Sequence, residues 1–206
     1  DGVAPDPAWN AVMVPSTGVK WGDYTAAQSV FGGNQWLPIE CDARIRATWF
    51  WRTDNVRTLK TIDQLMDMYY RSVGHGAVML LNSTPDRTGL IPESDAQRAA
   101  EFGDTIRRRL GTPVGETRGT GTAVTLTLKA STSIAHVVLM ENLAGGERVR
   151  EYVVEGRIQG QWQPLSSGTA IGHKKIDRIA PTVVDAVRVR ITRTAGTPVI
   201  RRFAVY

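Results

Sequence analysis

Two carboxylates stand among aromatic residues in the stretch WLPIECDARIRATWFW, which runs from Trp36 to Trp51. Glu40 and Asp42 are the carboxylates, and Trp49 is one of the aromatic residues that follow them. Aromatic faces pack against the apolar C–H face of a sugar, while carboxylates and guanidiniums hydrogen-bond its hydroxyl groups. The stretch therefore suits a carbohydrate pocket. The same residues also fit a half-buried strand whose tryptophans belong to the core and whose charges pair at a rim.

Within this stretch the two carboxylates share a predicted face. Asp42 lies on the same side as Glu40 if the segment is extended, because alternate residues of a strand share a side, and Cys41 then points away into the core. Glu40 is the best candidate in the chain for catalysis or for contact with a sugar hydroxyl. Alternatively, Glu40 has a structural role in an ion pair with Arg44 or Arg46. The same alternative applies to Asp42, which then pairs with Arg44.

Composition limits the function classes. The chain has 206 residues, a net charge of +5 and 42% hydrophobic residues, and no apolar run has the length of a membrane span. The arginines are mostly scattered and no nucleic-acid-binding motif is present, so the basic balance indicates a solvated surface, and neither nucleic acid nor a membrane is an expected partner. The single cysteine and three well-separated histidines predict no disulfide, no metal site and no cofactor.

The N-terminal segment is rich in turn-forming residues. A short strand is expected at 11–14, followed by a long loop that carries Trp21 and Tyr24 and has room for a short helix near 25–31. The chain opens on a loop-like segment without an initiator methionine. We expect a fragment or a chain processed at its N-terminus.

A helix is predicted after Thr61, because Gln64 three residues later completes a capping-box pattern. Gly74 is expected to end it. Tyr70 is expected at the rim of this helix. The residues expected on its apolar face, at helical spacing, are Ile62, Leu65, Met66, Tyr69 and Val73.

The apolar run 77–82 predicts a buried parallel strand, and a second helix is predicted from Ser94 onward. The residues that this helix should turn inward are Ala99, Phe102, Ile106 and Leu110. Strand and helix patterns that alternate in this way are typical of an α/β fold. They are too few for a closed eight-fold barrel, but they fit the last part of one.

After a Gly/Thr/Pro-rich linker at 111–121 the pattern changes to the two-residue period of strands. Turns are expected at Gly145–Gly146 and at Gly160. The candidate strands are 123–128, 134–140, 148–158, 161–164, 183–193 and 198–206. This second part is predicted to be an all-β sandwich or jelly roll, so the chain divides into an α/β domain at 1–113 and a β-sandwich domain at 114–206.

Several ordered blocks resemble the α-L-fucosidases of glycoside hydrolase family 29, with the closest match to the subgroup that acts on α-1,3/1,4-linked fucose branches. The blocks are W-x-P-x-E-x-D-x-x-I-R-x-x-W-F-W (36–51), D-x-Y-Y-x-S-V-G (67–74), L-L-N-x-x-P-D-x-x-G-L-I (80–91) and Asp95. The β part resembles the C-terminal sandwich of those enzymes, which is related to galactose-binding and discoidin domains. The resemblance covers nearly the whole chain.

The resemblance implies a retaining glycosidase on a (β/α)8-type barrel, of which this chain holds the C-terminal part followed by the β-sandwich. Its two-carboxylate mechanism needs an Asp nucleophile and a Glu acid/base. No segment matches the nucleophile strand, and the acid/base is expected near Gly2 or ahead of it. Some relatives carry a glutamate directly before the tryptophan that matches Trp9, where this chain has Ala8. The missing N-terminal half of the barrel is therefore an expected partner, and the substrate is a fucosylated oligosaccharide or glycoconjugate.

On this basis Glu40 becomes a substrate-binding residue with a weaker claim to catalysis, and Asp42 is placed beside it. Trp49 is the candidate for the apolar wall against the fucose methyl group, with core packing as its alternative, and Trp36 and Trp51 are further candidates of the same kind. Structural roles are expected for several other polar residues. These are His75 near the strand entry, and Asn82 and Asp86 in the turn that follows the strand.

The alternative function is a non-catalytic carbohydrate-binding or structural module, because β-sandwich domains often bind glycans. A secreted or periplasmic location is expected if the full chain has a signal peptide.

Overall fold

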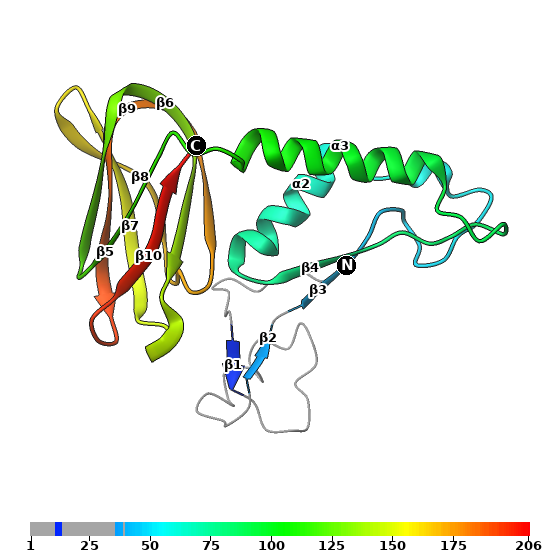
Figure 1. The fold of residues 1–206 in the computed structure, drawn as a ribbon, viewed down its shortest axis with the longest axis horizontal. Helices are drawn as coiled ribbons and strands as arrows, with labels where there is room; N and C mark the ends of the chain where they lie inside the picture. Colours follow the sequence, from blue (N-terminus) through cyan, green and yellow to red (C-terminus); the bar gives the residue numbers. More distant parts are fainter. Residues whose placement is uncertain (1–10, 14–35, 39) are drawn as a thin grey trace. The chain divides into compact units, whose positions relative to one another are not determined.

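The structure is a computed structural model that describes residues 11–13, 36–38 and 40–206. The predictions that concern Gly2, Ala8 and Trp9, the expected loop with Trp21 and Tyr24, and the expected short helix near 25–31 all lie outside these residues. The described chain is mostly β-strand with few helices (Figure 1). It divides into two compact units: one holds 40–73 and Ala77–Arg109, and the other holds Gly74–Gly76 and Leu110–Tyr206.

The first unit contains two small sheets. Strands β1 (Ala11–Met13) and β2 (Trp36–Pro38) pair antiparallel, and β1 confirms the strand predicted near residue 11. Strands β3 (Glu40–Arg44) and β4 (Val78–Asn82) lie side by side and run in the same direction (Figure 1). A parallel pair needs a crossover, and the chain between them supplies η1 (Val56–Thr58), helix α2 (Ile62–Arg71) and η2 (Val73–His75).

Helix α2 begins as its sequence predicts. Thr61 Oγ1 accepts a hydrogen bond from the Gln64 amide (3.2 Å), and Gln64 Oε1 accepts one from the Thr61 amide (2.9 Å). The helix ends at Arg71, earlier than the predicted stop at Gly74, because Ser72 forms the C-cap and its hydroxyl donates to the Met68 carbonyl (2.7 Å).

The assignment of the two tyrosines of α2 was wrong. Tyr70 is the buried one and Tyr69 is half-buried. Tyr70 follows Met66 by four residues and so shares its buried face. Tyr69 packs edge-on against Phe102 of α3, with ring centroids 6.1 Å apart.

Helix α3 spans Glu93–Leu110, and its buried residues are Asp95, Phe102 and Thr105. Phe102 confirms the prediction, but Ala99 is exposed. The buried face of α3 lies to one side of Ala99 and includes a charged residue, Asp95. A search for apolar periodicity does not detect such a position.

The second unit is one sheet of six strands in the order β5-β10-β6-β9-β7-β8. Its strands are β5 (Gly115–Thr120), β6 (Ala123–Glu141), β7 (Val149–Ile158), β8 (Gln161–Gly168), β9 (Lys175–Thr194) and β10 (Val199–Val205). A short 3-10 helix, η3 (Leu143–Gly145), lies between β6 and β7. Gly146 and Gly160 have positive φ at the predicted turns.

Strands β6 and β9 are longer than predicted and bend. The two strands predicted at 123–128 and 134–140 are one strand, whose register against β9 shifts between Thr127 and Thr132 and again between Ile134 and His136. Beyond the bend, the second half of β6 pairs with β10 and with the first half of β9. The sheet therefore curls so that its two parts share one hydrophobic core.

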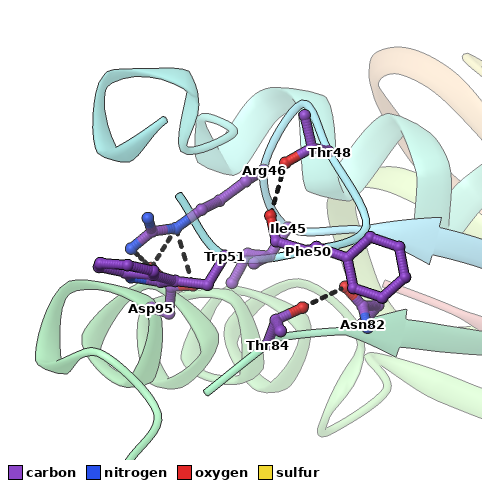
Figure 2. Close-up of a pocket in the computed structure, with 8 residues that line it drawn as sticks. All are labelled: Ile45, Arg46, Thr48, Phe50, Trp51, Asn82, Thr84 and Asp95. Carbon is purple, nitrogen blue, oxygen red and sulfur yellow. Dashed lines mark hydrogen bonds and ion pairs between the residues drawn. The ribbon is translucent and has the colours of Figure 1, made fainter. Parts of the chain in front are cut away.

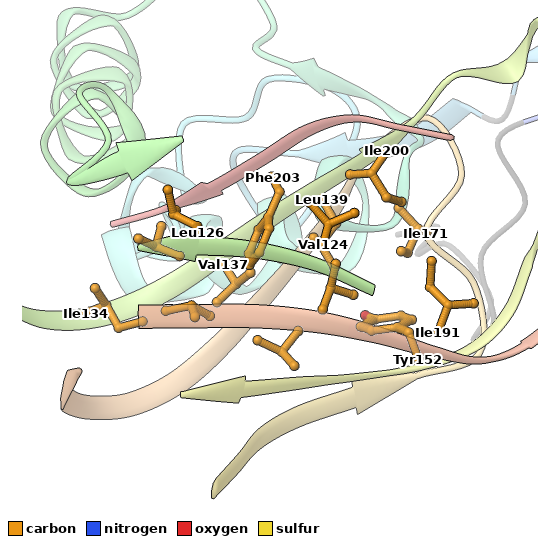
Figure 3. Packing of buried hydrophobic residues seen from close by; sticks show 14 of the residues in the cluster. Val124, Leu126, Ile134, Val137, Leu139, Tyr152, Ile171, Ile191, Ile200 and Phe203 are labelled. Carbon is orange, nitrogen blue, oxygen red and sulfur yellow. The ribbon is translucent and has the colours of Figure 1, made fainter. Parts of the chain in front are cut away.

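That core joins residues from both halves of the bent strands (Figure 3). Val187, Val189 and Ile191 of β9 are buried, in agreement with the predicted alternation. Phe203 of β10 and Tyr152 of β7 are the largest fully buried side chains. Burial of this cluster is the main source of stability that the unit can draw on.

The predicted linker at 111–121 was wrong in its second half, because Gly115–Thr120 is the edge strand β5 paired with β10. Its glycines lie over the core. A Cβ at Gly115 would stand 2.9 Å from the Leu128 Cδ2 atom, and one at Gly119 would stand 3.0 Å from Val124 Cγ2. Here glycine therefore permits close packing rather than chain flexibility.

Candidate functional site

Strand β3 presents its two carboxylates on one face. Glu40 and Asp42 are exposed while Cys41 and Ala43 are buried, which confirms the predicted shared face and the inward cysteine. In the parallel register Glu40 faces Val78 and Asp42 faces Leu80 of β4.

The prediction of a buried strand at 77–82 fails on this face of β4. The side chains of Val78 and Leu80 are each 52% exposed. Parallel strands are usually covered on both faces, so this face of the β3–β4 pair presents carboxylates and uncovered aliphatic groups together.

A buried ion pair lies at the carboxyl end of β3. Arg46 Nη2 donates to Asp95 Oδ1 (2.7 Å) and Arg46 Nε contacts both carboxylate oxygens (3.0 Å each), with both side chains almost fully buried. The alternative in which Arg46 pairs with Glu40 is therefore wrong. The partner comes from α3, and Figure 2 shows Arg46 and Asp95 together with Trp51 around one small pocket.

Asn55 links the Arg46–Asp95 ion pair to the aromatic loop 48–51. It is buried; its Oδ1 accepts a hydrogen bond from Arg46 Nη1 (2.8 Å), and its Nδ2 donates to Thr48 Oγ1 (2.8 Å) and to the Phe50 carbonyl (3.2 Å). From the other side, Thr84 Oγ1 contacts the Trp49 carbonyl (2.5 Å) and Asn82 Oδ1 (3.2 Å). The loop is therefore held from two sides, by Asn55 just before η1 and by Thr84 just after β4.

Lys60 fixes the end of β3 itself. Its Nζ donates to the carbonyls of Arg44 (2.6 Å) and Arg46 (3.1 Å), and its amide donates to the Ile45 carbonyl (2.9 Å). Burial lowers the pKa of the Lys60 ammonium, and the nearby Arg44 charge lowers it further. No sequence pattern marked Lys60 or Asn55, because each acts through partners distant along the chain.

Two aromatic side chains of the loop, Trp49 and Phe50, face outward, and Trp51 is half-buried. Trp49 is 40% exposed and Phe50 is 77% exposed, so neither is a core residue. The Arg44 guanidinium lies 5.2 Å from the centre of the Trp49 ring, and that of Arg87 lies 6.0 Å from Trp51. Arginine over an indole keeps the ring in place while its edge stays accessible.

An open groove of about 550 Å³ runs beside this loop. It is lined by residues of 50–54 and 84–87, and it shares Phe50, Trp51 and Thr84 with the small pocket of Figure 2. Asp86 forms part of the turn as predicted: its carboxylate accepts from Thr88 Oγ1 (2.5 Å) and the Thr88 amide (2.7 Å), and these hydrogen bonds lower its pKa. Aromatic edges, hydroxyls and charges in one groove are groups that bind sugars.

The remaining sequence-predicted residue, Trp36, lies in β2 opposite Met13, and its side chain is outside the described part. No cluster of three or more metal-binding side chains occurs among the residues that the structure describes. In the same residues no helix is long and apolar enough to cross a membrane.

Comparison with known proteins shows a match to one enzyme family in the part of the chain that holds these residues. Residues 10–109 match the sequence profile of the α-L-fucosidase family, and the match includes β3, β4, the aromatic loop and Asp95. The matched region carries the ion pair, the aromatic loop and the groove.

Individual relatives extend the similarity over the rest of the chain. α-L-Fucosidase 1 of Arabidopsis thaliana is 26% identical over an alignment that covers 100% of this chain and 48% of the plant enzyme. A crystal structure of a candidate α-L-fucosidase from Bacteroides thetaiotaomicron is 33% identical with a TM-score of 0.88, and the match covers 100% of this chain and 49% of that one.

A family 29 fucosidase from Ruminococcus gnavus, solved in complex with fucose, is 27% identical with a TM-score of 0.84. The match covers 100% of this chain and 48% of that structure. The chain therefore spans about half the length of these relatives.

Proposed function

We propose that this chain forms the C-terminal part of a retaining α-L-fucosidase that releases fucose from α-1,3/1,4 branches of oligosaccharides. The observation that carries the proposal is the aromatic loop and groove at the carboxyl ends of two parallel strands, inside the region that matches the family. In (β/α) barrels the site is built at that end of the strands. Fucose in the complex of the R. gnavus relative supports the choice of sugar.

The β3–α2–β4–α3 segment would form the last part of the (β/α) barrel within 1–113, and 114–206 would form the β-sandwich. The uncovered face with Val78 and Leu80 supports a barrel completed by further strands, because a parallel sheet buries such side chains. The relatives are about twice as long as this chain, which leaves room for those strands.

In the proposed site Glu40 and Asp42 accept hydrogen bonds from sugar hydroxyls, and Trp49 with Trp51 and Trp36 provides the apolar wall. Retention of configuration requires a nucleophile and an acid/base about 5 Å apart. We assign both to the part of the barrel outside these residues, with Glu40 as the in-chain candidate if one of them is absent there.

The test uses the full-length protein with an aryl α-L-fucoside and an α-1,3/1,4-fucosylated trisaccharide, followed by NMR of the released anomer. Because a retaining mechanism keeps the anomeric configuration, α-L-fucose is expected as the first product, before mutarotation forms the β-anomer. No release from either substrate overturns the proposal, and glycan binding without hydrolysis favours the non-catalytic module instead.

A pair of tryptophan variants locates the site. Trp49→Ala should lower kcat/KM by up to about tenfold, because one aromatic contact is worth up to about 1.5 kcal/mol. Trp162→Ala, in β8 of the other unit, is the matched control and should leave kcat/KM unchanged. Equal losses in the two variants would remove Trp49 from the sugar site.

A further inference from the structure

A second hollow lies on the β-sheet unit, apart from the residues of the proposed fucose site. This cleft of about 360 Å³ is lined by residues of β5, β10 and the turn after β6. Its lining residues are Arg118, Gly119, Thr120, Asn142, Val199, Ile200 and Arg201. Two of them are arginines and none is acidic.

The outer face of two neighbouring strands brings these arginines together. Val199 pairs with Thr120 and Ile200 with Gly119, and the register then shifts before Phe203 pairs with Thr117. The register of β10 against β6 shifts at the same place, between Ile200 and Arg202. Arg201 thus stands in a β-bulge opposite Arg118, and bulges commonly redirect a side chain beside a functional site.

The bulge arginine is held in one orientation. Its Nε donates to the Glu141 carbonyl (3.0 Å) and its Nη2 donates to the His173 carbonyl (3.1 Å), which leaves Nη1 as a donor. A guanidinium fixed in this way loses little freedom when it binds an anion.

The buried carboxylate of Glu141 orders the backbone near the two carbonyls that hold Arg201. This carboxylate accepts from the amides of Arg148 (2.9 Å), Val149 (3.1 Å) and Gly172 (2.9 Å). It therefore ties the turn after β6 to the segment that precedes β9.

The remaining groups add donors and positive potential. Asn142 Oδ1 accepts from the Ala144 amide (3.0 Å), which leaves its Nδ2 as a donor, and Thr120 adds a hydroxyl. Burial lowers the pKa of the nearby His173, and the positive charges of Arg201 and Lys174 lower it further. The part of this shift that comes from the two charges reflects the positive potential beside the cleft. The nearby acid on the same face of β5, Glu116, is paired with Arg202 (2.9 Å).

We propose that this cleft binds the anionic group of a charged sugar, either a carboxylate or a sulfate ester. Two guanidiniums, an amide and a hydroxyl around a cleft provide the donors such groups accept from, and arginine binds their paired oxygens with both arms of its fork. The site lies on residues that the proposed fucosidase chemistry does not use, so it stands or falls independently of that activity.

The test is an NMR titration of the isotope-labelled full-length protein with glucuronate and, separately, with N-acetylglucosamine 6-sulfate. Both have neutral counterparts, glucose and N-acetylglucosamine, as controls. Saturable shifts of the Gly119, Thr120 and Asn142 amides are expected with at least one charged sugar and not with its neutral counterpart. The charged sugar that binds distinguishes the carboxylate from the sulfate.

Arg118→Ala should weaken binding by about tenfold or more, the effect of one charge-assisted hydrogen bond, without changing the thermal midpoint because the side chain is exposed. Lys129→Ala removes the same charge from the exposed bend of β6 and should leave affinity unchanged. Absence of saturable shifts, equal shifts with neutral sugars, or equal losses in the two variants would each overturn the proposal.

Discussion

The Arg46–Asp95 pair gives the sharpest stability prediction. Asp95→Asn keeps the size of the side chain but leaves the guanidinium of Arg46 buried without its counter-charge. Arg46 makes three contacts of 2.7–3.0 Å to this carboxylate, with side-chain exposures of 6% and 1% for the two residues. Breaking a buried pair on one side costs about 3–5 kcal/mol of unfolding free energy.

Urea unfolding followed by tryptophan fluorescence measures this loss, since Trp49 and Trp51 lie in the loop that Arg46 and Asn55 hold. The matched control is Asp54→Asn, which breaks an Arg–Asp pair of the same chemistry on the surface, where side-chain exposures are 63% and 59%. That variant should show no measurable change, because solvent screens exposed pairs.

A third variant separates charge from packing. Replacing the pair by Arg46→Met with Asp95→Leu removes both charges and should recover most of the loss seen in Asp95→Asn. If Asp95→Asn costs no more than Asp54→Asn, then burial does not set the strength of this pair and the reasoning is refuted.

Thr61→Ala removes the N-cap of α2 and should cost about 1 kcal/mol of unfolding free energy in the same urea assay, with retention of full stability counting against the cap. The hydrogen bond from Arg188 lowers the pKa of the Glu155 carboxyl in the folded protein. The stabilisation that this pair provides is therefore fully present above the pKa of Glu155 in the unfolded chain, and it is lost as the pH falls through the lower pKa of the folded state. Arg188→Gln should therefore destabilise at neutral pH and much less in strong acid; a pH-independent loss would contradict this. Gly156→Ala places a Cβ 2.7 Å from Val184 Cγ1 and should cost about 1–3 kcal/mol, whereas Gly103→Ala meets only the Arg107 side chain at 3.5 Å and should stabilise α3 by up to about 1 kcal/mol. Thermal midpoints that move in the same direction would refute the assignment of the close contact.

Much of the local structure could be predicted from the order of residues along the chain. The capping box of α2 depends on two residues three apart, and the alternation of Glu40, Cys41 and Asp42 depends only on strand geometry. The blocks that resemble α-L-fucosidases were equally visible, and residues 10–109 match the sequence profile of that family. The roles of Glu40, Asp42 and the tryptophans in sugar binding stay predictions.

Errors arose where a distant partner decides the outcome. Gly115–Thr120 reads as a linker by composition, but it becomes β5 because its glycines fit against Leu128 and Val124. Strands β6 and β9 are continuous through bends because each half pairs with different neighbours. Local propensity carries no information about which distant strand will be adjacent.

Residue order along the chain was enough to predict the helix start at Thr61 and the two-faced pattern of β3. The pairing of Arg46 with Asp95, 49 residues away, rather than with Glu40 depends on the tertiary structure. The tertiary structure likewise placed Arg201 in a bulge opposite Arg118. A charged side chain is paired by whichever counter-charge the fold brings within reach in a buried site, and that choice depends on packing between elements rather than on spacing along the chain.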